Sequence, residues 1–280
     1  MYIGITPLYD VYCLYNHTGG IFLRLSACID MLYSNMEFYD RFNAAKQNGF
    51  DTVEFWKWSN KNIDEIKRKM VENNLSCSVF NIDSRDPKLS DDLLRGILNS
   101  GRKIDLIQSL EESIPVYNLL GASGMIVLIG ETLDISYEKQ INNIIDCLLA
   151  VKPIVEKENV TLVVEPLNNF DRKNYFLPRS KEVIEIIKKV NSPNIKLLLD
   201  LYHEQLMAGN LIKTLTENID IIGHIHVADA PGRHEPGTGE INYGNVLKSI
   251  DNIYGGYVGL EFRANNYNSQ NSEYIRRIML

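Results

Sequence analysis

The stretch KLLLDLYHEQLMAGNLIKTLTENIDIIGHIHV, residues 196–227, contains the pattern that decides the fold of this chain. It begins with an apolar run at 196–201, continues with helical periodicity at 205–217, and ends with a second apolar run at 221–227. Two apolar runs on either side of a helix predict parallel strands joined by a crossover. Because both runs are almost continuously apolar, we expect strands that are buried on both faces.

The same unit recurs along the chain. Strands are predicted at 22–27, 52–56, 77–81, 125–129, 161–165, 196–201, 221–227 and 257–262. Helices are predicted at 36–48, at 63–72, over a long region ending near residue 120, and at 137–158, 180–190, 205–217, 243–250 and 272–279.

These repeats predict an α/β fold, a single-domain (β/α)8 TIM barrel over residues 21–280, preceded by an N-terminal extension over residues 1–20. An open doubly wound sheet is the alternative. That fold usually has a glycine-rich turn after its first strand, and here Gly19-Gly20 stands before the first strand.

Composition limits the class of protein. The 280 residues carry a formal net charge of −7, and no basic block suggests a nucleic-acid partner. The four cysteines have irregular spacing, which is typical of reduced thiols in a cytoplasmic protein. Neither a signal peptide nor an apolar run long enough to span a membrane is evident. We expect a cytoplasmic protein without a membrane partner.

Four successive predicted strands end with a side chain that can bind a metal: Glu165, Asp200, His226 and Glu261. In a barrel the carboxyl ends of the strands meet at one face, where catalytic groups are found. Three carboxylates meeting there would repel one another, and a divalent cation removes that penalty. An oxygen-rich site with one imidazole suits Mg²⁺, Mn²⁺ or Co²⁺. The alternative for each residue alone is a solvated carboxylate or a hydrogen-bonded core histidine.

Other polar residues are candidates for substrate contacts. His203 follows the strand that ends at Asp200, and Arg233 lies in the glycine-rich loop 231–243, where a guanidinium can bind an anion. Glu54 stands in a strand beside aromatic residues that could wall off water. Their structural alternatives are a surface histidine, a surface arginine and ordinary core packing. His224 is expected to be a hydrogen-bonded histidine one layer deeper than His226.

The segments VVEPLNNFDRKNYFL, LLLDLYHEQLMAGNL, IGHIHVADAPGRHEPGTGEINY and GYVGLEFR closely resemble the hydroxypyruvate isomerase family. That family belongs to the xylose-isomerase-like TIM-barrel superfamily, which includes the ketose 3-epimerases and endonuclease IV. The resemblance extends from about Phe22 to the C-terminus and is most specific over Glu165–Arg263.

The resemblance implies that Glu165, Asp200, His226 and Glu261 hold one divalent metal ion, Mn²⁺ or Mg²⁺ or else Co²⁺ or Zn²⁺. It implies that Glu165 and Glu261 are also the catalytic acid and base. His203, Arg233 and Asp171 match substrate-binding positions. Hydroxypyruvate isomerases often have glutamine at the position of His226, whereas histidine there is like the ketose 3-epimerases.

These observations lead to a hypothesis of function. We expect a metal-dependent isomerase that moves a proton on an α-hydroxy carbonyl compound through an enediolate, with a small keto acid or sugar as substrate. Ketose 3-epimerisation is the alternative within this class. An endonuclease IV-like nuclease and a non-catalytic sugar-binding barrel are alternatives of other classes. The resemblance also implies a homo-oligomer.

Overall fold

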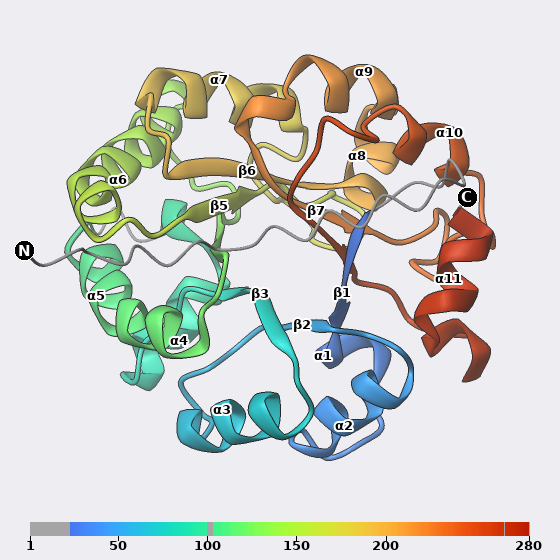
Figure 1. Ribbon diagram of the computed structural model, residues 1–280. Coiled ribbons are helices and arrows are strands. Elements are labelled where there is room, and N and C mark those ends of the chain that lie inside the picture. The colour runs from blue at the N-terminus through green and yellow to red at the C-terminus, as the bar shows by residue number, and fades with distance from the viewer. Residues whose placement is uncertain (1–22, 100–102, 266, 280) are drawn as a thin grey trace, which may run out of the picture.

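The computed structural model describes residues 23–99, 103–265 and 267–279 of the chain. The predicted extension over residues 1–20 lies outside the described residues. Within them, parallel strands close into a barrel in chain order from β1 to β8 (Figure 1), which confirms the (β/α)8 prediction. The strands are β1 Arg24–Cys28, β2 Thr52–Phe55, β3 Ser76–Asn81, β4 Gly124–Leu128, β5 Leu162–Glu165, β6 Ile195–Asp200, β7 Ile222–Val227 and β8 Tyr257–Leu260.

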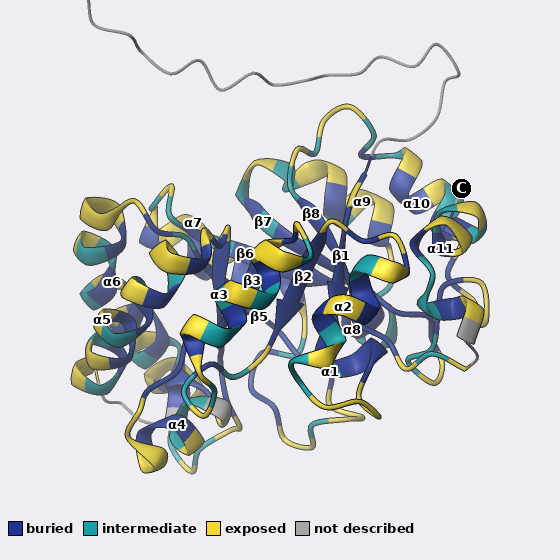
Figure 2. Cartoon of the chain, turned by 60° about the horizontal axis from the view of Figure 1, so that its bottom comes forward, coloured by how far each residue is buried: buried dark blue, intermediate teal, exposed yellow. Residues whose placement is uncertain are grey.

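Helices surround the barrel and cover the outer face of its strands (Figure 1). The α-helices are α1 Ile29–Leu32, α2 Asp40–Gln47, α3 Ile63–Glu72, α4 Pro87–Leu94, α5 Lys103–Leu120, α6 Tyr137–Glu158, α7 Ser180–Val190, α8 Leu201–Met207, α9 Leu211–Glu217, α10 Tyr243–Lys248 and α11 Ser272–Met279. Short 3-10 turns are η1 Ile97–Asn99, η2 Ile219–Ile221 and η3 Tyr267–Gln270. In Figure 2 the strands are mostly buried, while the helices alternate between buried inner and exposed outer faces.

The register of the strands brings their polar ends to one level. Asp200 of β6 is paired with His226 of β7, and Leu128 of β4 is paired with Glu165 of β5. The apolar residues before these ends are almost completely buried, as expected for strands with the barrel core on one side and helices on the other. The fold therefore delivers polar side chains from neighbouring strands to one mouth of the barrel.

The helix predicted over 205–217 is wrong, because the structure has two helices there. The carboxylate of Asp200 accepts the backbone N–H groups of Tyr202 and His203 and so starts α8 directly after β6. The first helix ends at the C-cap residue Ala208, which is followed by Gly209 with φ of 66°, and the left-handed Asn210, with φ of 56°, then precedes α9 as its N-cap residue. The long helical region before residue 120 is likewise divided into α4, η1 and α5.

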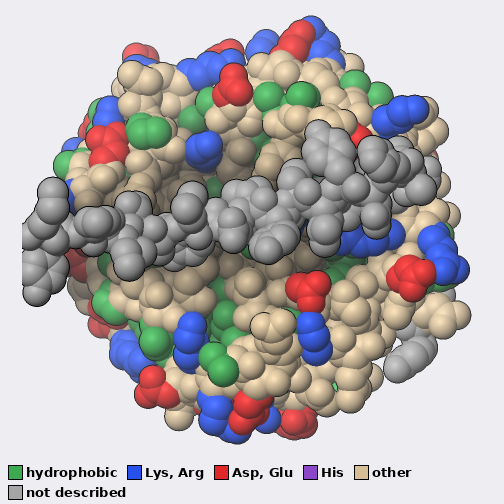
Figure 3. Space-filling view, viewed as in Figure 1, with side chains coloured by type: hydrophobic (Ala, Val, Ile, Leu, Met, Phe, Trp, Pro, Cys, Tyr) green, Lys and Arg blue, Asp and Glu red, His purple; other side chains and the backbone are tan. Residues whose placement is uncertain are grey.

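The outer surface has mixed charge. On the face that Figure 3 shows, basic and acidic side chains of the described residues are interspersed around the barrel. No helix in the described ranges combines the length and the apolar character needed to cross a bilayer.

The segment after α4 packs closely on the end of β4, and this contact generates a prediction. Leu98 N–H donates to the carbonyl of Ile129 at 2.7 Å, and Gly96 has φ of +98°. A Cβ on Gly96 would lie 2.3 Å from the backbone of Ile129 and Gly130. We expect Gly96→Ala to lower the free energy of unfolding by about 2–5 kcal/mol, from backbone strain and overpacking together.

Gly121→Ala is the matched control, because Gly121 also has positive φ, +68°, but an added Cβ would meet no atom within 4 Å. Strain alone should lower its stability by about 1–2 kcal/mol. Urea unfolding of both variants measures the difference, and equal losses would show that the close approach at Gly96 is unimportant.

Candidate metal centre and active site

The four side chains predicted as metal ligands meet at the carboxyl end of the barrel. Glu165 ends β5, Asp200 ends β6, His226 lies near the end of β7, and Glu261 directly follows β8. One ligand atom from each lies within 4.8 Å of the others, and all four residues are buried. The structure thus brings together four groups that are far apart in the sequence.

Asp200 uses its two oxygens for different contacts. Its Oδ1 accepts the backbone N–H of Tyr202 at 2.8 Å and that of His203 at 3.4 Å, which caps α8. Its Oδ2 lies 3.3 Å from Nη2 of Arg233 and 3.4 Å from Nε2 of His203. The cap therefore fixes the carboxylate without using the oxygen that faces the site.

His226 stands at the centre of the cluster. Its Nδ1 lies 3.4 Å from Oε1 of Glu165 and 3.3 Å from Oε2 of Glu261, and its Nε2 lies 3.0 Å from Oε1 of Glu54. Burial disfavours the charged imidazole, but the carboxylates of Glu261 and Glu54 outweigh burial and raise the pKa of His226.

The two glutamates that face His226 have different surroundings. Burial raises the pKa of Glu165 to about 7 and outweighs the nearby imidazole. Burial acts in the same direction on Glu261, but Arg233 and His226 hold the pKa of that carboxyl well below its usual range. Trp56 Nε1 also donates to Oε1 of Glu261 at 2.8 Å, while the guanidinium of Arg233 donates to its Oε2. Glu261 is thus the more firmly held and more strongly ionised member of the pair.

Two atoms that face each other in this cluster, Oε1 of Glu165 and Nδ1 of His226, lie 3.4 Å apart, and both are buried without a hydrogen bond to any described residue. Such atoms normally have a partner, because an unpaired buried polar atom is unfavourable. A divalent cation would satisfy both atoms and reduce the repulsion among the three carboxylates. Three carboxylates and one imidazole also match the ligand preferences of Mg²⁺, Mn²⁺, Co²⁺ and Zn²⁺. The residues present fit a single divalent ion.

A cavity of about 580 Å³ adjoins the cluster, with Glu165 and Glu261 in its wall. Three residues predicted to bind substrate, His203, Arg233 and Asp171, also line it. Together these five side chains surround a space large enough for a small organic molecule.

His203 is held as a neutral imidazole in the cavity wall. Its Nδ1 accepts the backbone N–H of Asn168 at 3.3 Å. Burial lowers the pKa of His203 to about 4 and outweighs the neighbouring Asp200. Its Nε2 lies 3.4 Å from Oδ2 of Asp200 but is buried without a hydrogen bond in the described part of the chain, so it can still donate to a ligand oxygen.

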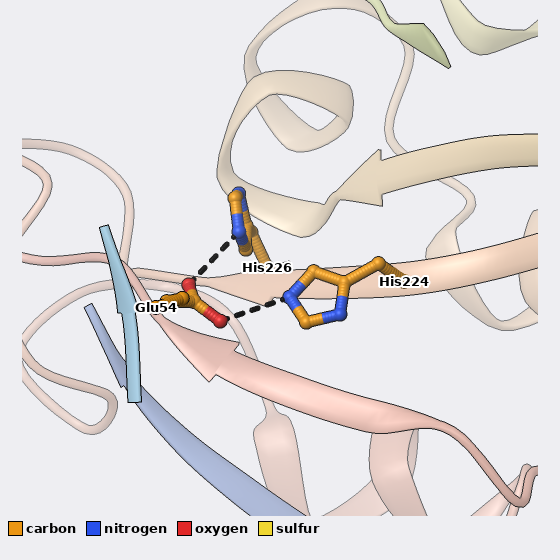
Figure 4. A group of neighbouring side chains, drawn as sticks. All are labelled: Glu54, His224 and His226. Carbon is orange, nitrogen blue, oxygen red and sulfur yellow. Dashed lines mark hydrogen bonds and ion pairs between the residues drawn. The ribbon is translucent and has the colours of Figure 1, made fainter. Parts of the chain in front are cut away.

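Glu54 lies elsewhere than the sequence suggested. It is not in the wall of the cavity but in the barrel interior, where its carboxylate stands between His224 and His226 (Figure 4). The interpretation of Glu54 as a substrate contact does not fit this position. Burial raises the pKa of Glu54, yet the two histidines outweigh it and lower the pKa to about 2. His224 is hydrogen-bonded there, as expected, with its Nε2 at 3.1 Å from Oε2 of Glu54.

Several cavity residues were not predicted as substrate contacts, although Trp56 is one of the aromatic residues beside Glu54 that could wall off water. Trp56 and Asn81 stand at the ends of β2 and β3, and this strand-end position is the signal that could have found them. Lys57, Arg95 and Arg172 add three cationic side chains to the wall. They lie in loops and after α4, where no strand pattern distinguishes them from surface residues.

The chain is similar to known isomerases over most of its length. Hydroxypyruvate isomerase from Escherichia coli (strain K12) is 34% identical over 244 residues, which cover 86% of this chain and 93% of that protein. The 2-oxo-tetronate isomerase from Cupriavidus necator is 30% identical over 242 residues, which cover 86% of this chain and 92% of that protein. These likenesses confirm the resemblance seen in the sequence motifs.

A crystal structure named AP endonuclease, family 2, from Brucella melitensis has a TM-score of 0.82 and 26% identity, covering 89% of this chain and 96% of that one. The family described as "Xylose isomerase-like TIM barrel" matches residues 42–278, a range that includes the four candidate ligands and the cavity residues named above. The chain therefore belongs to the xylose isomerase-like TIM barrel family.

Proposed function

We propose that this chain is a metal-dependent isomerase that moves a proton on an α-hydroxy carbonyl compound. The proposed substrate is a small keto acid or sugar. The observation that carries the proposal is the convergence of Glu165 and Glu261 on one buried donor set beside a cavity. Relatives named hydroxypyruvate isomerase and 2-oxo-tetronate isomerase support the reaction class and favour a keto acid.

The proposed chemistry is proton transfer between neighbouring carbons. Removal of a proton from the hydroxyl-bearing carbon beside a carbonyl gives an enediolate. Return of a proton to the adjacent carbon, together with transfer of the hydroxyl proton from one oxygen to the other, exchanges the two functional groups. Glu165 and Glu261 come from β5 and from the end of β8, with β6 and β7 between them, so they approach from different sides. One removes the proton, and the same or the other carboxyl returns it.

The ion would be held by Glu165, Asp200, His226 and Glu261. When bound, a divalent cation stabilises negative charge that develops on substrate oxygens. Arg233 supplies a guanidinium that can bind a carboxylate in a fork, and the neutral His203 offers its unpaired Nε2 to a substrate oxygen.

Epimerisation is the second candidate, and His226 favours it, because histidine at this position resembles the ketose 3-epimerases. In that reaction the proton returns to the same carbon from the opposite face. A nuclease activity has less support, because the chain is acidic and its visible charges are interspersed (Figure 3). Proton NMR of the products separates isomerisation from epimerisation.

Asp200→Asn tests the ion site without removing the helix cap. Asparagine can still cap α8 through its oxygen, but the group facing the site loses its negative charge. Wild-type protein should gain about 2.7 kcal/mol of stability when Mn²⁺ is present at 100 times its Kd. Under the same conditions the variant should lose most of that gain. Thermal unfolding with Mn²⁺ or with a chelator measures it, and an equal gain in both proteins would contradict the proposed ligand set.

Glu165→Gln and Glu261→Gln test the proton transfer. Each change keeps the shape of the side chain but removes the carboxylate that accepts a proton. We expect each to slow exchange of the substrate C–H proton in D2O by at least about 100-fold. Proton NMR with Mn²⁺ and a panel of three- to six-carbon keto acids and ketoses measures the exchange. Circular dichroism verifies that each variant is folded.

Glu240→Gln is the control for these two variants, because Glu240 is an exposed carboxylate in the loop after β7 that pairs with Gln205. Its exchange rate should equal that of the wild type. If the wild-type protein with Mn²⁺ exchanged no C–H proton on any compound of the panel, the proposed isomerase activity would be wrong.

A further inference from the structure

Glu54 is a buried carboxylate that the proposed proton transfer does not use. It is 2% exposed and lies on β2, on the far side of His226 from Glu165 and Glu261. Figure 4 shows its two oxygens directed at two different imidazoles. Oε1 lies 3.0 Å from Nε2 of His226, and Oε2 lies 3.1 Å from Nε2 of His224. Burial of a carboxylate is unfavourable unless the charge is paired and hydrogen-bonded.

The barrel interior is shaped to hold this carboxylate. Ser78 donates a hydrogen bond to Oε2 of Glu54 at 2.9 Å, and its hydroxyl lies 2.6 Å from that of Ser26. On the opposite side, a Cβ on Gly259 would lie 2.3 Å and 2.6 Å from the two oxygens of Glu54 and 2.7 Å from Cδ2 of His226. Only glycine at this position of β8 leaves room for the carboxylate beside the ring.

The contact between Glu54 and His226 determines which ring nitrogen of the neutral imidazole carries its proton. Oε1 of Glu54 and Nε2 of His226 are both buried, they face each other as an ion pair, and neither has a hydrogen bond to any described residue. At 3.0 Å, each is therefore the polar group available to the other. A neutral imidazole has one N–H and one lone pair, so a proton on Nε2 leaves the lone pair on Nδ1. That nitrogen faces Glu165 and Glu261.

We propose that Glu54 is a positioning residue that keeps the proton of His226 on Nε2 and directs the lone pair of Nδ1 to the cation site. The inference rests on the proposed metal site and deepens it. Through the same carboxylate, His224 and Ser78 hold Oε2, so that Oε1 stays directed at His226. Partners of this kind orient an imidazole ligand and raise its basicity.

A second cation among Glu54, His224 and His226 is the competing explanation, because their ligand atoms also lie within 4.8 Å of one another. The two groups share His226, so occupation of both would require lone pairs on Nδ1 and Nε2 together. That state is an imidazolate, one proton short of the neutral ring. The hydrogen bond from Ser78 also occupies one oxygen of Glu54. The chemistry of the shared ring thus favours one ion and one hydrogen bond.

The test compares Glu54→Gln with Ser78→Ala in the full chain, each freed of metal with a chelator and titrated with Mn²⁺. A glutamine amide has one oxygen and one NH2 group, so it cannot accept from both histidines at once. Ser78→Ala removes a buried partner of the same carboxylate but leaves Oε1 and His226 unchanged. Electron paramagnetic resonance of free Mn²⁺ gives the affinity and the number of ions bound.

We expect one Mn²⁺ per chain in the wild type, an affinity about 10- to 100-fold weaker in Glu54→Gln, and a nearly wild-type affinity in Ser78→Ala. Equal affinity in wild type and Glu54→Gln would overturn the role of Glu54 and leave the proposed function intact. Equal losses in both variants would overturn that role as well, since they would indicate general damage to the core. Two ions per chain would assign the cluster to a second cation. A wild type that binds no Mn²⁺ would overturn the metal site and this inference together.

Nitrogen NMR of histidine-labelled wild-type protein with the diamagnetic ion Zn²⁺ provides a second measurement, which decides the question even if Glu54→Gln does not fold. The expected spectrum of His226 has the proton on Nε2 and none on Nδ1. A proton on Nδ1 instead would overturn the proposal.

Discussion

The repulsion among three buried carboxylates at one mouth of the barrel is the constraint on which the rest of the site depends. Glu165, Asp200 and Glu261 are each at most 5% exposed, so solvent does little to screen them from one another. Cationic and hydrogen-bonding side chains of the same chain reduce this repulsion. Arg233 contacts two of the carboxylates, and His226 lies between Glu165 and Glu261. Oε1 of Glu165 and Nδ1 of His226 remain without a hydrogen bond to any described residue, and they mark where a divalent ion fits.

Contacts outside the four candidate ligands fix the orientation of their carboxylates. Asp200 is fixed by capping α8 with the oxygen that does not face the site. Glu261 is fixed by the indole of Trp56, which follows β2, two strands away from β8 in the closed barrel. In both cases a structural hydrogen bond uses one oxygen of a carboxylate and leaves the second to the site. Closure of the barrel makes this possible, because it places β8 beside β1 and brings the end of β2 close to Glu261.

The sequence predicted the parts of the structure that follow from local pattern. The helices at 63–72, 137–158 and 180–190 have the bounds expected from periodicity, and the first two also begin after a side-chain cap, from Asn62 and Ser136. The four strand-end groups could be aligned because each directly follows an apolar run. The break at Gly209-Asn210 was missed by periodicity, since residues 205–217 keep helical periodicity on both sides of it, although glycine followed by asparagine is itself a signal that ends a helix. The position of Glu54 could not be predicted either. Alternation along TVEF indicates that its carboxylate points inward, but not whether it reaches the cavity or the layer of the barrel interior below the cavity.

The layer of the barrel interior around Glu54 explains why the four candidate ligands alone do not define the site. Glu54 comes from β2, its histidine partners come from β7, and the space it fills exists because β8 has glycine at position 259. A chain that kept Glu165, Asp200, His226 and Glu261 but had a larger residue at 259 would force the carboxylate of Glu54 or the ring of His226 to move. The donor set can be read from strand ends, but its geometry is set by pairings between distant strands. Those pairings become visible only when the barrel is closed.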